Sequence, residues 1–197
     1  METVRSFIAV ELDAVVLTAL GDLQSRLKRA PLGRLGRWVA PEGIHLTLKF
    51  LGSVPKERIP EIGEAVARAA RETAPFEITI AGLGCFPTVR RPRVIWVGVE
   101  EPSGALERLQ SAVEHELERL GFAPEGRGFT PHLTLARIRD HATERERAEC
   151  GAWIKQQGVG RLAVMRVHEV CLMQSDLRPT GAVYTRLSAA PLQHVEE

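Results

Sequence analysis

The sequence predicts an α+β protein of two lobes related by a pseudo-twofold axis, each with a mostly antiparallel sheet and outer helices. Three observations lead to this prediction. Segments typical of strands and helices mix along the 197 residues without a strict βαβ alternation. The order of these segments in the first half returns in the second half. The tetrapeptide His-Leu-Thr-Leu occurs twice, at residues 45–48 and 132–135.

The elements of the first half follow from hydrophobic spacing and turn residues. A strand at 4–12 is followed by a helix that begins at Asp13 and has its apolar stripe at 16, 20, 23 and 27. A basic loop at 26–37, which contains Pro31, and a turn at 41–43 lead to a strand that ends at Pro55. A helix over 59–69 and strands at 76–83 and 93–99 complete the half.

The second half repeats this order. A helix capped by Ser103, with its apolar stripe at 106, 109, 113, 117 and 120, is followed by a glycine-rich loop at 121–128 and a strand at 132–138. A helix over 143–156 comes next. Two strands at 162–174 and 182–187, separated by a turn at 178–181, and a frayed tail at 193–197 end the chain. We expect one domain over 1–197 made of two duplicated lobes, with the half boundary near 100–103 and the motif segments at 38–52 and 129–138.

Composition excludes several classes of protein. With 26 Lys and Arg against 25 Asp and Glu, the formal net charge is +1, which argues against nucleic-acid binding by bulk charge. The hydrophobic content of 44% excludes intrinsic disorder, and no apolar run is long enough to span a membrane. The first apolar segment is interrupted by Glu11 and does not resemble a secretory signal, so we expect a cytoplasmic protein. The three cysteines are far apart, which argues against a disulfide framework.

The repeated tetrapeptide carries the chemistry. Residues i and i+2 of a strand project from the same face, so each histidine shares a face with its threonine while the leucines point to the other face. Two imidazoles can supply one general base and one general acid, and two hydroxyls can bind the oxygens of a phosphate. The predicted catalytic residues are therefore His45 and His132, with Thr47 and Thr134 as phosphate ligands.

Two basic residues follow these motifs. Lys49 shares the parity of His45 and is expected either to tune that histidine or to form a salt bridge at the rim. Arg137 follows Thr134 by three residues, so simple alternation places it on the other face unless a bulge intervenes. On this alternation Arg137 is a solvated surface arginine.

The segments WVAPEGIHLTLKFLG and FTPHLTLAR resemble the two signature segments of the two-histidine (2H) phosphoesterase superfamily. Within it, they are most similar to the prokaryotic RNA 2′,3′-cyclic phosphodiesterases, also called 2′-5′ RNA ligases. The opening RSFIAVEL and the late LMQSDLRPTGAVYTRL resemble the same family, so the resemblance spans nearly the whole chain.

This resemblance implies a bilobal fold with a central groove and hydrolysis of a terminal RNA 2′,3′-cyclic phosphate to a 2′-phosphate. It also implies reversible 2′-5′ ligation, His45 as proton donor to the 3′ oxygen and His132 as proton acceptor from water. Thr47 and Thr134 would hold the phosphate, and Arg137 would reach the phosphate or the RNA. We expect no cofactor and no metal, RNA ends such as those of tRNA halves as partners, no membrane, and a monomer.

Other interpretations stay open. The two histidines could bind zinc with Asp140 or His141 as a third ligand. The protein could be another 2H phosphodiesterase that acts on nucleotide cyclic phosphates or 2′-5′ oligonucleotides, or an inactive RNA-binding module. The basic run at 26–37 is either a solvated face or a track for RNA.

Aromatic residues and the remaining histidines complete the expectations. Four aromatic residues could stack RNA bases or belong to the core: Phe7, Phe50, Trp38 and Phe129. We assign Trp96, Trp153 and Tyr184 to the core. We expect the histidines that lack a threonine two residues later to be non-catalytic: His115, His141, His168 and His194.

Overall fold

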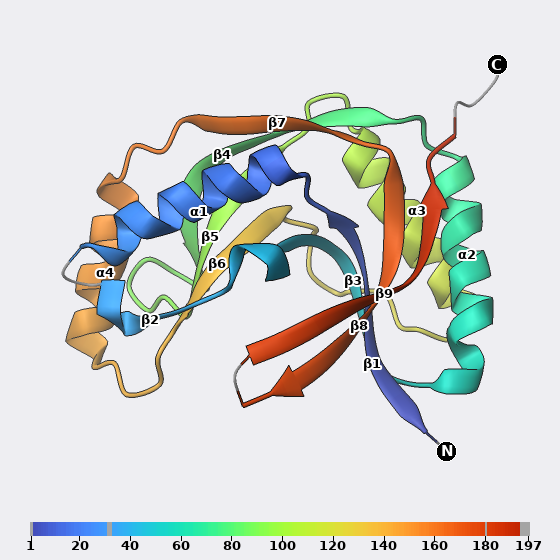
Figure 1. The fold of residues 1–197 in the computed structure, drawn as a ribbon, viewed down its shortest axis with the longest axis horizontal. Helices are drawn as coiled ribbons and strands as arrows, with labels where there is room; N and C mark the ends of the chain where they lie inside the picture. The colour runs from blue at the N-terminus through green and yellow to red at the C-terminus, as the bar shows by residue number, and fades with distance from the viewer. Residues whose placement is uncertain (1, 31–32, 180, 194–197) are drawn as a thin grey trace.

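The computed structural model (Figure 1) describes residues 2–30, 33–179 and 181–193, and this part of the chain forms two antiparallel sheets and four α-helices. The strands are β1 (Thr3–Glu11), β2 (Gly36–Trp38), β3 (His45–Pro55), β4 (Phe76–Phe86), β5 (Val94–Glu100), β6 (His132–Ile138), β7 (Arg161–Val167), β8 (Glu169–Arg178) and β9 (Gly181–Pro191). The helices are α1 (Ala14–Lys28), α2 (Ile59–Arg71), α3 (Ala105–Glu118) and α4 (Glu144–Gln156). Pro31, Thr180 of the predicted turn, and residues 194–197 with His194 lie outside the described residues.

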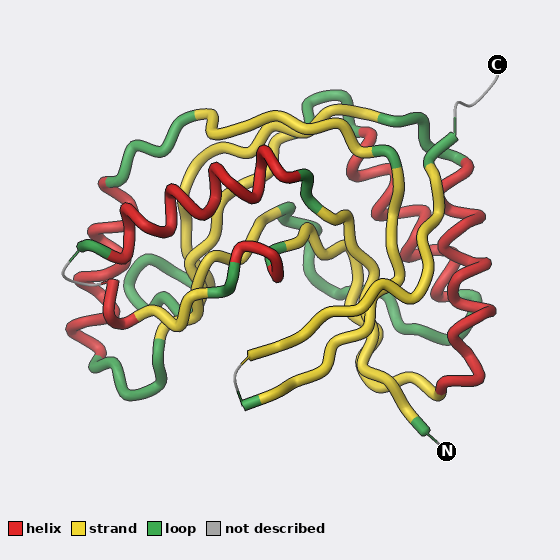
Figure 2. Tube along the Cα trace, in the orientation of Figure 1, coloured by secondary structure: helices red, strands yellow, loops and turns green. Residues whose placement is uncertain are grey.

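Each sheet and its helices form one lobe. The four-stranded sheet has the order β3-β1-β8-β9 and packs against α2 and α3; we call this the first lobe. The five-stranded sheet has the order β2-β6-β5-β4-β7 and packs against α1 and α4; we call this the second lobe (Figure 2). The predicted α+β class with two antiparallel sheets is confirmed.

The two lobes are not the two halves of the sequence. Strands β4 and β5 precede the expected boundary at 100–103, yet they join the second lobe. Strands β8 and β9 lie near the end of the chain, yet they join the first lobe. Neither half could therefore bury its own core, because each sheet depends on strands from both halves.

Two further differences from the sequence analysis concern strands. The run predicted as one strand at 162–174 is two strands in different sheets, since β7 pairs with β4 and β8 pairs with β1 and β9. Figure 1 shows β7 crossing between the lobes before the chain turns into β8. The residue at this break is His168. Within the predicted basic loop, the short β2 pairs with β6.

Capping groups mark the helix starts. The Asp13 side chain accepts a hydrogen bond of 2.8 Å from the backbone N–H of Val16, as predicted. Ser103 is not the N-cap of α3, because that position is Gly104. The carboxylate of Glu101 instead accepts a bond of 3.1 Å from the backbone N–H of Leu106, which supplies the acceptor that a capping side chain normally provides.

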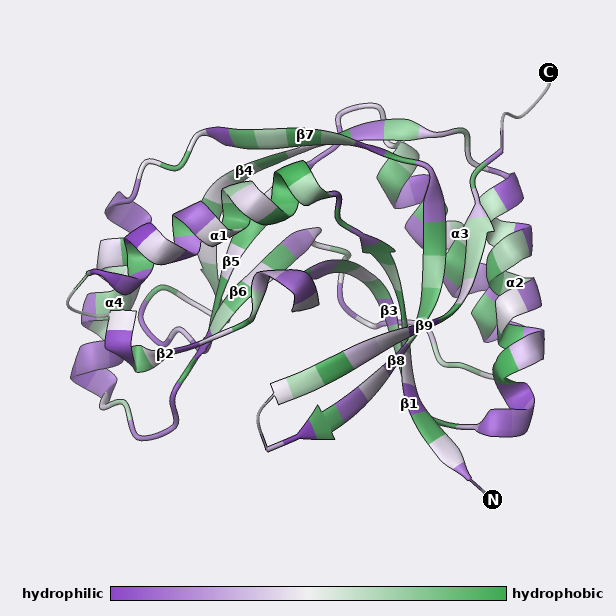
Figure 3. Cartoon of the chain, viewed as in Figure 1, coloured by the Kyte–Doolittle hydropathy of each residue, from purple (hydrophilic) through white to green (hydrophobic). Residues whose placement is uncertain are grey.

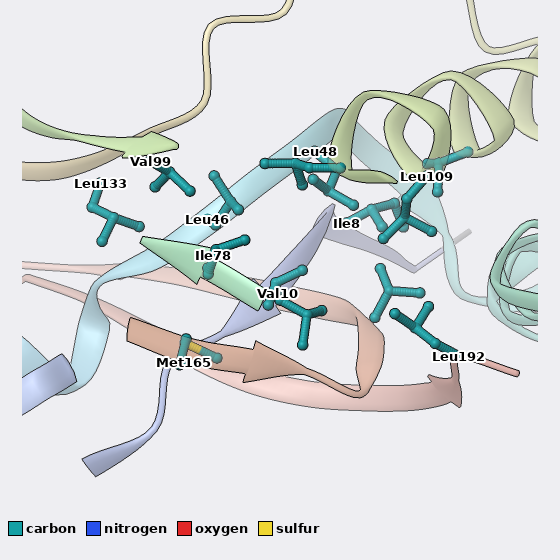
Figure 4. Close-up of a cluster of buried hydrophobic side chains, with 14 of the residues drawn as sticks. Ile8, Val10, Leu46, Leu48, Ile78, Val99, Leu109, Leu133, Met165 and Leu192 are labelled. Atoms are coloured by element: carbon teal, nitrogen blue, oxygen red, sulfur yellow. The ribbon is translucent and has the colours of Figure 1, made fainter. Parts of the chain in front are cut away.

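The main core joins both lobes. The leucines of the two tetrapeptides, Leu46, Leu48, Leu133 and Leu135, are buried in one cluster, part of which is drawn in Figure 4. The four helices carry both hydrophobic and hydrophilic residues, as expected for helices that bury one face (Figure 3). Among the described residues, no helix has the length and apolar character needed to cross a membrane.

Candidate active site

The two His-Leu-Thr-Leu tetrapeptides begin β3 and β6 and have the same burial pattern. In each strand the histidine and the threonine are half-buried, whereas the leucines between them are buried. Strand β3 is an edge of its sheet and contacts β6 of the other sheet. Leu46 and Leu133, which follow the two histidines, lie in the same core cluster (Figure 4). The fold thus brings the two motifs to the boundary between the lobes.

Both motif strands contain a bulge directly after the threonine. In β3, Thr47 lies opposite Ala9 and Lys49 lies opposite Ile8, which leaves Leu48 as the extra residue. In β6, Thr134 lies opposite Trp96 and Ala136 lies opposite Ile95, so Leu135 is extra. A bulge of this kind reverses the alternation of the residues that follow it.

The first bulge changes the expected position of Lys49. The side chain points to the helix side, where only 1% of it is exposed and its Nζ donates to Glu114 Oε2 of α3 at 2.5 Å. A second bond of 2.8 Å goes to the carbonyl oxygen of Ala123. Lys49 therefore neither tunes His45 nor lies at the rim, because simple alternation, on which both expectations rested, fails at Leu48.

The second bulge returns Arg137 to the face of His132 and Thr134. Arg137 is exposed, and its neighbours Ala136 and Ile138 are buried on the other face. Phe50 has the matching position in β3, three residues after Thr47, and is 58% exposed. Each motif thus presents three side chains on one face: a histidine, a threonine and then a long side chain of different chemistry.

Both histidines make the same backbone hydrogen bond. The Nδ1 of His45 lies 3.0 Å from the carbonyl oxygen of Gly43, and the Nδ1 of His132 lies 2.7 Å from that of Thr130. Because a carbonyl only accepts, each Nδ1 carries the proton and donates it in this bond. This arrangement fixes the tautomer and leaves each Nε2 available for proton transfer.

Aromatic rings surround His45. Its ring stacks on Phe7 with centroids 4.6 Å apart, and Tyr184 meets it edge-on at 4.8 Å. Phe7 and Tyr184 also contact one another at 5.4 Å. These contacts hold the orientation of the imidazole plane.

Aromatic rings from β4 and β5 also lie beside His132. Phe86 meets it edge-on at 4.9 Å, and Trp96 lies 6.2 Å away. The Trp96 ring also lies over Gly84, since a Cβ at that glycine would come within 2.4 Å of it. Trp96 and Tyr184, assigned to the core from the sequence, are only partly buried: Tyr184 packs against a core cluster, as expected, and both rings also lie beside the histidines. Their strands contained no polar motif, and their proximity to the histidines depends on cross-strand register, which the sequence does not reveal.

The electrostatic environment of His45 differs from that of an exposed histidine. Burial lowers the pKa of His45 to about 4, while the bond to Gly43 and the negative charge of Glu11 act in the opposite direction. Glu11 lies directly opposite His45 in the β1–β3 pair. The Arg186 guanidinium binds Glu11 through Nε at 2.6 Å, so this carboxylate is already partly neutralised.

A pocket of about 150 Å³ opens beside His45. Its lining includes Glu42, Met173 and Tyr184, and also Leu17 from α1 of the other lobe. The hollow thus lies at the boundary between the lobes, but His132 does not line it.

The described residues offer one group with the spacing of a metal site, formed by Glu11, Glu169 and Cys171. Both carboxylates of this group bind Arg186. A cation already occupies the position that a metal would need, so the group fits a metal poorly. Asp140 and His141, the suggested zinc ligands, lie in the turn after β6 and do not join this group.

The other candidate residues have mixed outcomes. Of the four aromatic candidates, only Phe50 is exposed; Phe7 is buried, and Trp38 and Phe129 pack against the core. In the basic run, Lys28 lies over the ring of Trp38 at 5.6 Å, and Arg34 pairs with Glu146 at 3.4 Å.

The two motifs place two imidazoles, each with Nδ1 bonded to a backbone carbonyl, and two threonine hydroxyl groups on strands that contact one another. Such a set can move protons on and off oxygen and can bind a compact anion. Comparison with known proteins identifies the family. Residues 17–179 match the family described as the 2′-5′ RNA ligase superfamily.

Individual relatives cover almost the whole chain. The RNA 2′,3′-cyclic phosphodiesterase of Methanothermobacter thermautotrophicus is 38% identical over 182 residues, which cover 92% of this chain and 95% of that protein. A crystal structure of a Thermus thermophilus protein, TT0787, superposes with a TM-score of 0.79 at 30% identity and covers 96% of this chain and 98% of its own. The structure of Escherichia coli LigT complexed with 3′-AMP has a TM-score of 0.77 at 27% identity and covers 98% of this chain and 100% of its own.

The chain therefore belongs to the 2′-5′ RNA ligase superfamily. Within it, the chain falls among the RNA 2′,3′-cyclic phosphodiesterases, so the enzyme family expected from the sequence is confirmed.

Proposed function

We propose that this enzyme hydrolyses the terminal 2′,3′-cyclic phosphate of RNA to a 2′-phosphate by acid-base catalysis between His45 and His132. The observation that carries the proposal is the duplicated arrangement of histidine and threonine, in which both Nδ1 atoms are held by a backbone carbonyl. A displacement at phosphorus needs a base on the incoming oxygen and an acid on the departing oxygen, and two imidazoles can meet that need.

In this reaction His132 Nε2 takes a proton from water as the water oxygen bonds to phosphorus. The bond from phosphorus to the 3′ oxygen breaks, and His45 Nε2 gives its proton to that oxygen. The products are a 2′-phosphate and a free 3′-hydroxyl. This assignment of acid and base follows the family resemblance, because the two motifs are too similar to decide it.

Thr47 and Thr134 would donate hydrogen bonds to the non-bridging phosphate oxygens. Hydroxyl donors placed where negative charge develops stabilise the transition state. Arg137, on the same face of β6, would add a positive charge to phosphate or RNA binding.

The low pKa of His45 makes its protonation depend on the substrate. With a pKa of about 4, the imidazole is neutral near pH 7 in the free enzyme. A bound anionic phosphate favours the imidazolium and raises this pKa. His45 would therefore act as an acid mainly in the complex with substrate.

The proposed partners are RNA fragments that end in a cyclic phosphate, such as tRNA halves, bound by a monomer in the cytoplasm. The reverse reaction would join a 2′-5′ linkage at the same site. The family likeness to an enzyme whose structure holds 3′-AMP supports recognition of a nucleotide end.

Product analysis tests the proposal. A short RNA with a 2′,3′-cyclic phosphate end is incubated with the enzyme in EDTA, and the product end is identified as a 2′- or 3′-phosphate. We expect a 2′-phosphate with the wild type and none with His132→Ala. Activity that returns only with added zinc or manganese would contradict the two-histidine mechanism.

A further inference from the structure

Arg37 and Arg137 lie directly opposite one another in the antiparallel pair of β2 and β6. Residues opposite one another in such a pair project from the same face, and like charges in that position repel. Both arginines are exposed. Among the described residues, neither guanidinium has a carboxylate within ion-pair distance, whereas the nearby Arg34 and Arg91 both have one.

The flanking pairs show which face the arginines occupy. Gly36 lies opposite Ile138, and Trp38 lies opposite Ala136. Ala136 and Ile138 belong to one buried hydrophobic cluster, Trp38 packs against that cluster, and Gly36 is buried. The arginine pair is therefore on the other face. His132 and Thr134 lie on the same face of β6 as Arg137, because the bulge at Leu135 shifts the alternation of the residues that follow it.

The arginine pair lies in the same cross-strand row as Phe86, an aromatic residue that contacts His132. Across β5, Arg137 lies opposite Val94, and Val94 lies opposite Phe86 of β4. The ring of Phe86 contacts His132 at 4.9 Å. The row thus runs from the two arginines to the ring that packs against His132.

We infer that Arg37 and Arg137 form a subsite for a backbone phosphodiester of the RNA, next to the terminal cyclic phosphate. This inference rests on the proposed function and adds a preference for oligonucleotides over mononucleotides. Two adjacent guanidinium groups without a carboxylate suit a diester anion, which both can contact at once. A mononucleotide cyclic phosphate has no second phosphate and cannot use the subsite.

The test compares a dinucleotide that ends in a 2′,3′-cyclic phosphate with the same dinucleotide carrying an uncharged methylphosphonate linkage. The variants are Arg37→Gln, Arg37→Lys and, as a matched control, Arg34→Gln. We expect Arg37→Gln to lower kcat/KM for the charged dinucleotide about tenfold, mainly through KM, and to have a much smaller effect on the methylphosphonate. Arg37→Lys should recover part of the loss, and Arg34→Gln should resemble the wild type.

Equal losses on both substrates, or no loss on either, would overturn the inference. Binding of RNA with a 2′-phosphate end gives an independent result that needs no turnover. Arg37→Gln should reduce the slope of log affinity against log salt by about 0.7, as expected for one lost contact to a single strand, and an unchanged slope would contradict the subsite. If the wild type opens neither dinucleotide, the proposed function is wrong. The salt dependence of RNA binding by the wild type and Arg37→Gln still tests whether the subsite binds a phosphodiester.

Discussion

The imidazole of His45 stacks on the ring of Phe7, with centroids 4.6 Å and planes 28° apart. This contact explains why the environment of His45 is poor in water, and why its pKa falls to about 4. His45 is therefore neutral near pH 7 in the free enzyme, and in the proposed mechanism it becomes an acid when an anion binds. The first predictions follow from this property.

Phosphate binding should raise the pKa of His45. A bound anion stabilises the imidazolium, so titration by NMR should give a value near 4 in the free enzyme and a clearly higher one with a saturating nucleoside 2′-phosphate. The His45→Gln variant, which lacks this resonance, serves as a control. An unchanged pKa in the complex would contradict contact between the phosphate and His45.

The stability of the free enzyme should fall in acid because of His45. Its folded pKa is below the unfolded value of 6.5, so the unfolded state binds the proton more tightly. This contribution is complete above pH 6.5 and is lost as the pH falls towards 4, by at most about 3 kcal/mol. Urea unfolding of the wild type and His45→Gln between about pH 4 and 7 measures it, and parallel curves for both proteins would contradict it.

Replacing either threonine should lower the rate with little effect on stability. Thr47→Val and Thr134→Val keep the side-chain shape but remove the hydroxyl donor, so kcat should fall roughly 10- to 1000-fold. Thr47→Ser and Thr134→Ser retain the donor and should keep most of the activity. Equal activity of the valine and serine variants would show that the hydroxyls do not bind the phosphate.

Lys49 should affect stability and not the chemistry. Lys49→Met leaves Glu114 without its buried partner, which should cost about 3 kcal/mol or more of unfolding free energy. Lys49→Met combined with Glu114→Leu should recover much of this loss, because neither charge is then left alone. A change in the pH dependence of kcat in the folded double variant would instead support a role in tuning His45.

Local patterns predicted much of the fold. The apolar stripe after Asp13 and the alternation within both tetrapeptides depend on neighbouring residues alone, and the structure contains the helix and the strands that they predict. The sequence does not reveal the break at His168, because both strands are rich in apolar residues and no Gly or Pro stands between them; only their pairing in different sheets separates them.

The candidate site was only partly predictable for a similar reason. The histidines and threonines stand in a repeated motif, so the sequence identifies them. Tyr184 and Trp96 reach the two histidines through cross-strand register, which a single sequence does not encode locally. The bulges at Leu48 and Leu135 also depend on the partner strands, and they decide the faces of Lys49 and Arg137.

A substrate with sulfur in place of the 3′ oxygen tests the central claim most directly. A thiolate leaves without help from an acid, so this substrate needs the base but not the acid. We predict that His45→Ala, which opens the normal cyclic phosphate very slowly, recovers most of the wild-type rate on the sulfur substrate, while His132→Ala stays inactive on both. Recovery by His132→Ala alone would exchange the two roles, and recovery by both variants or by neither would contradict the division of acid and base between these histidines.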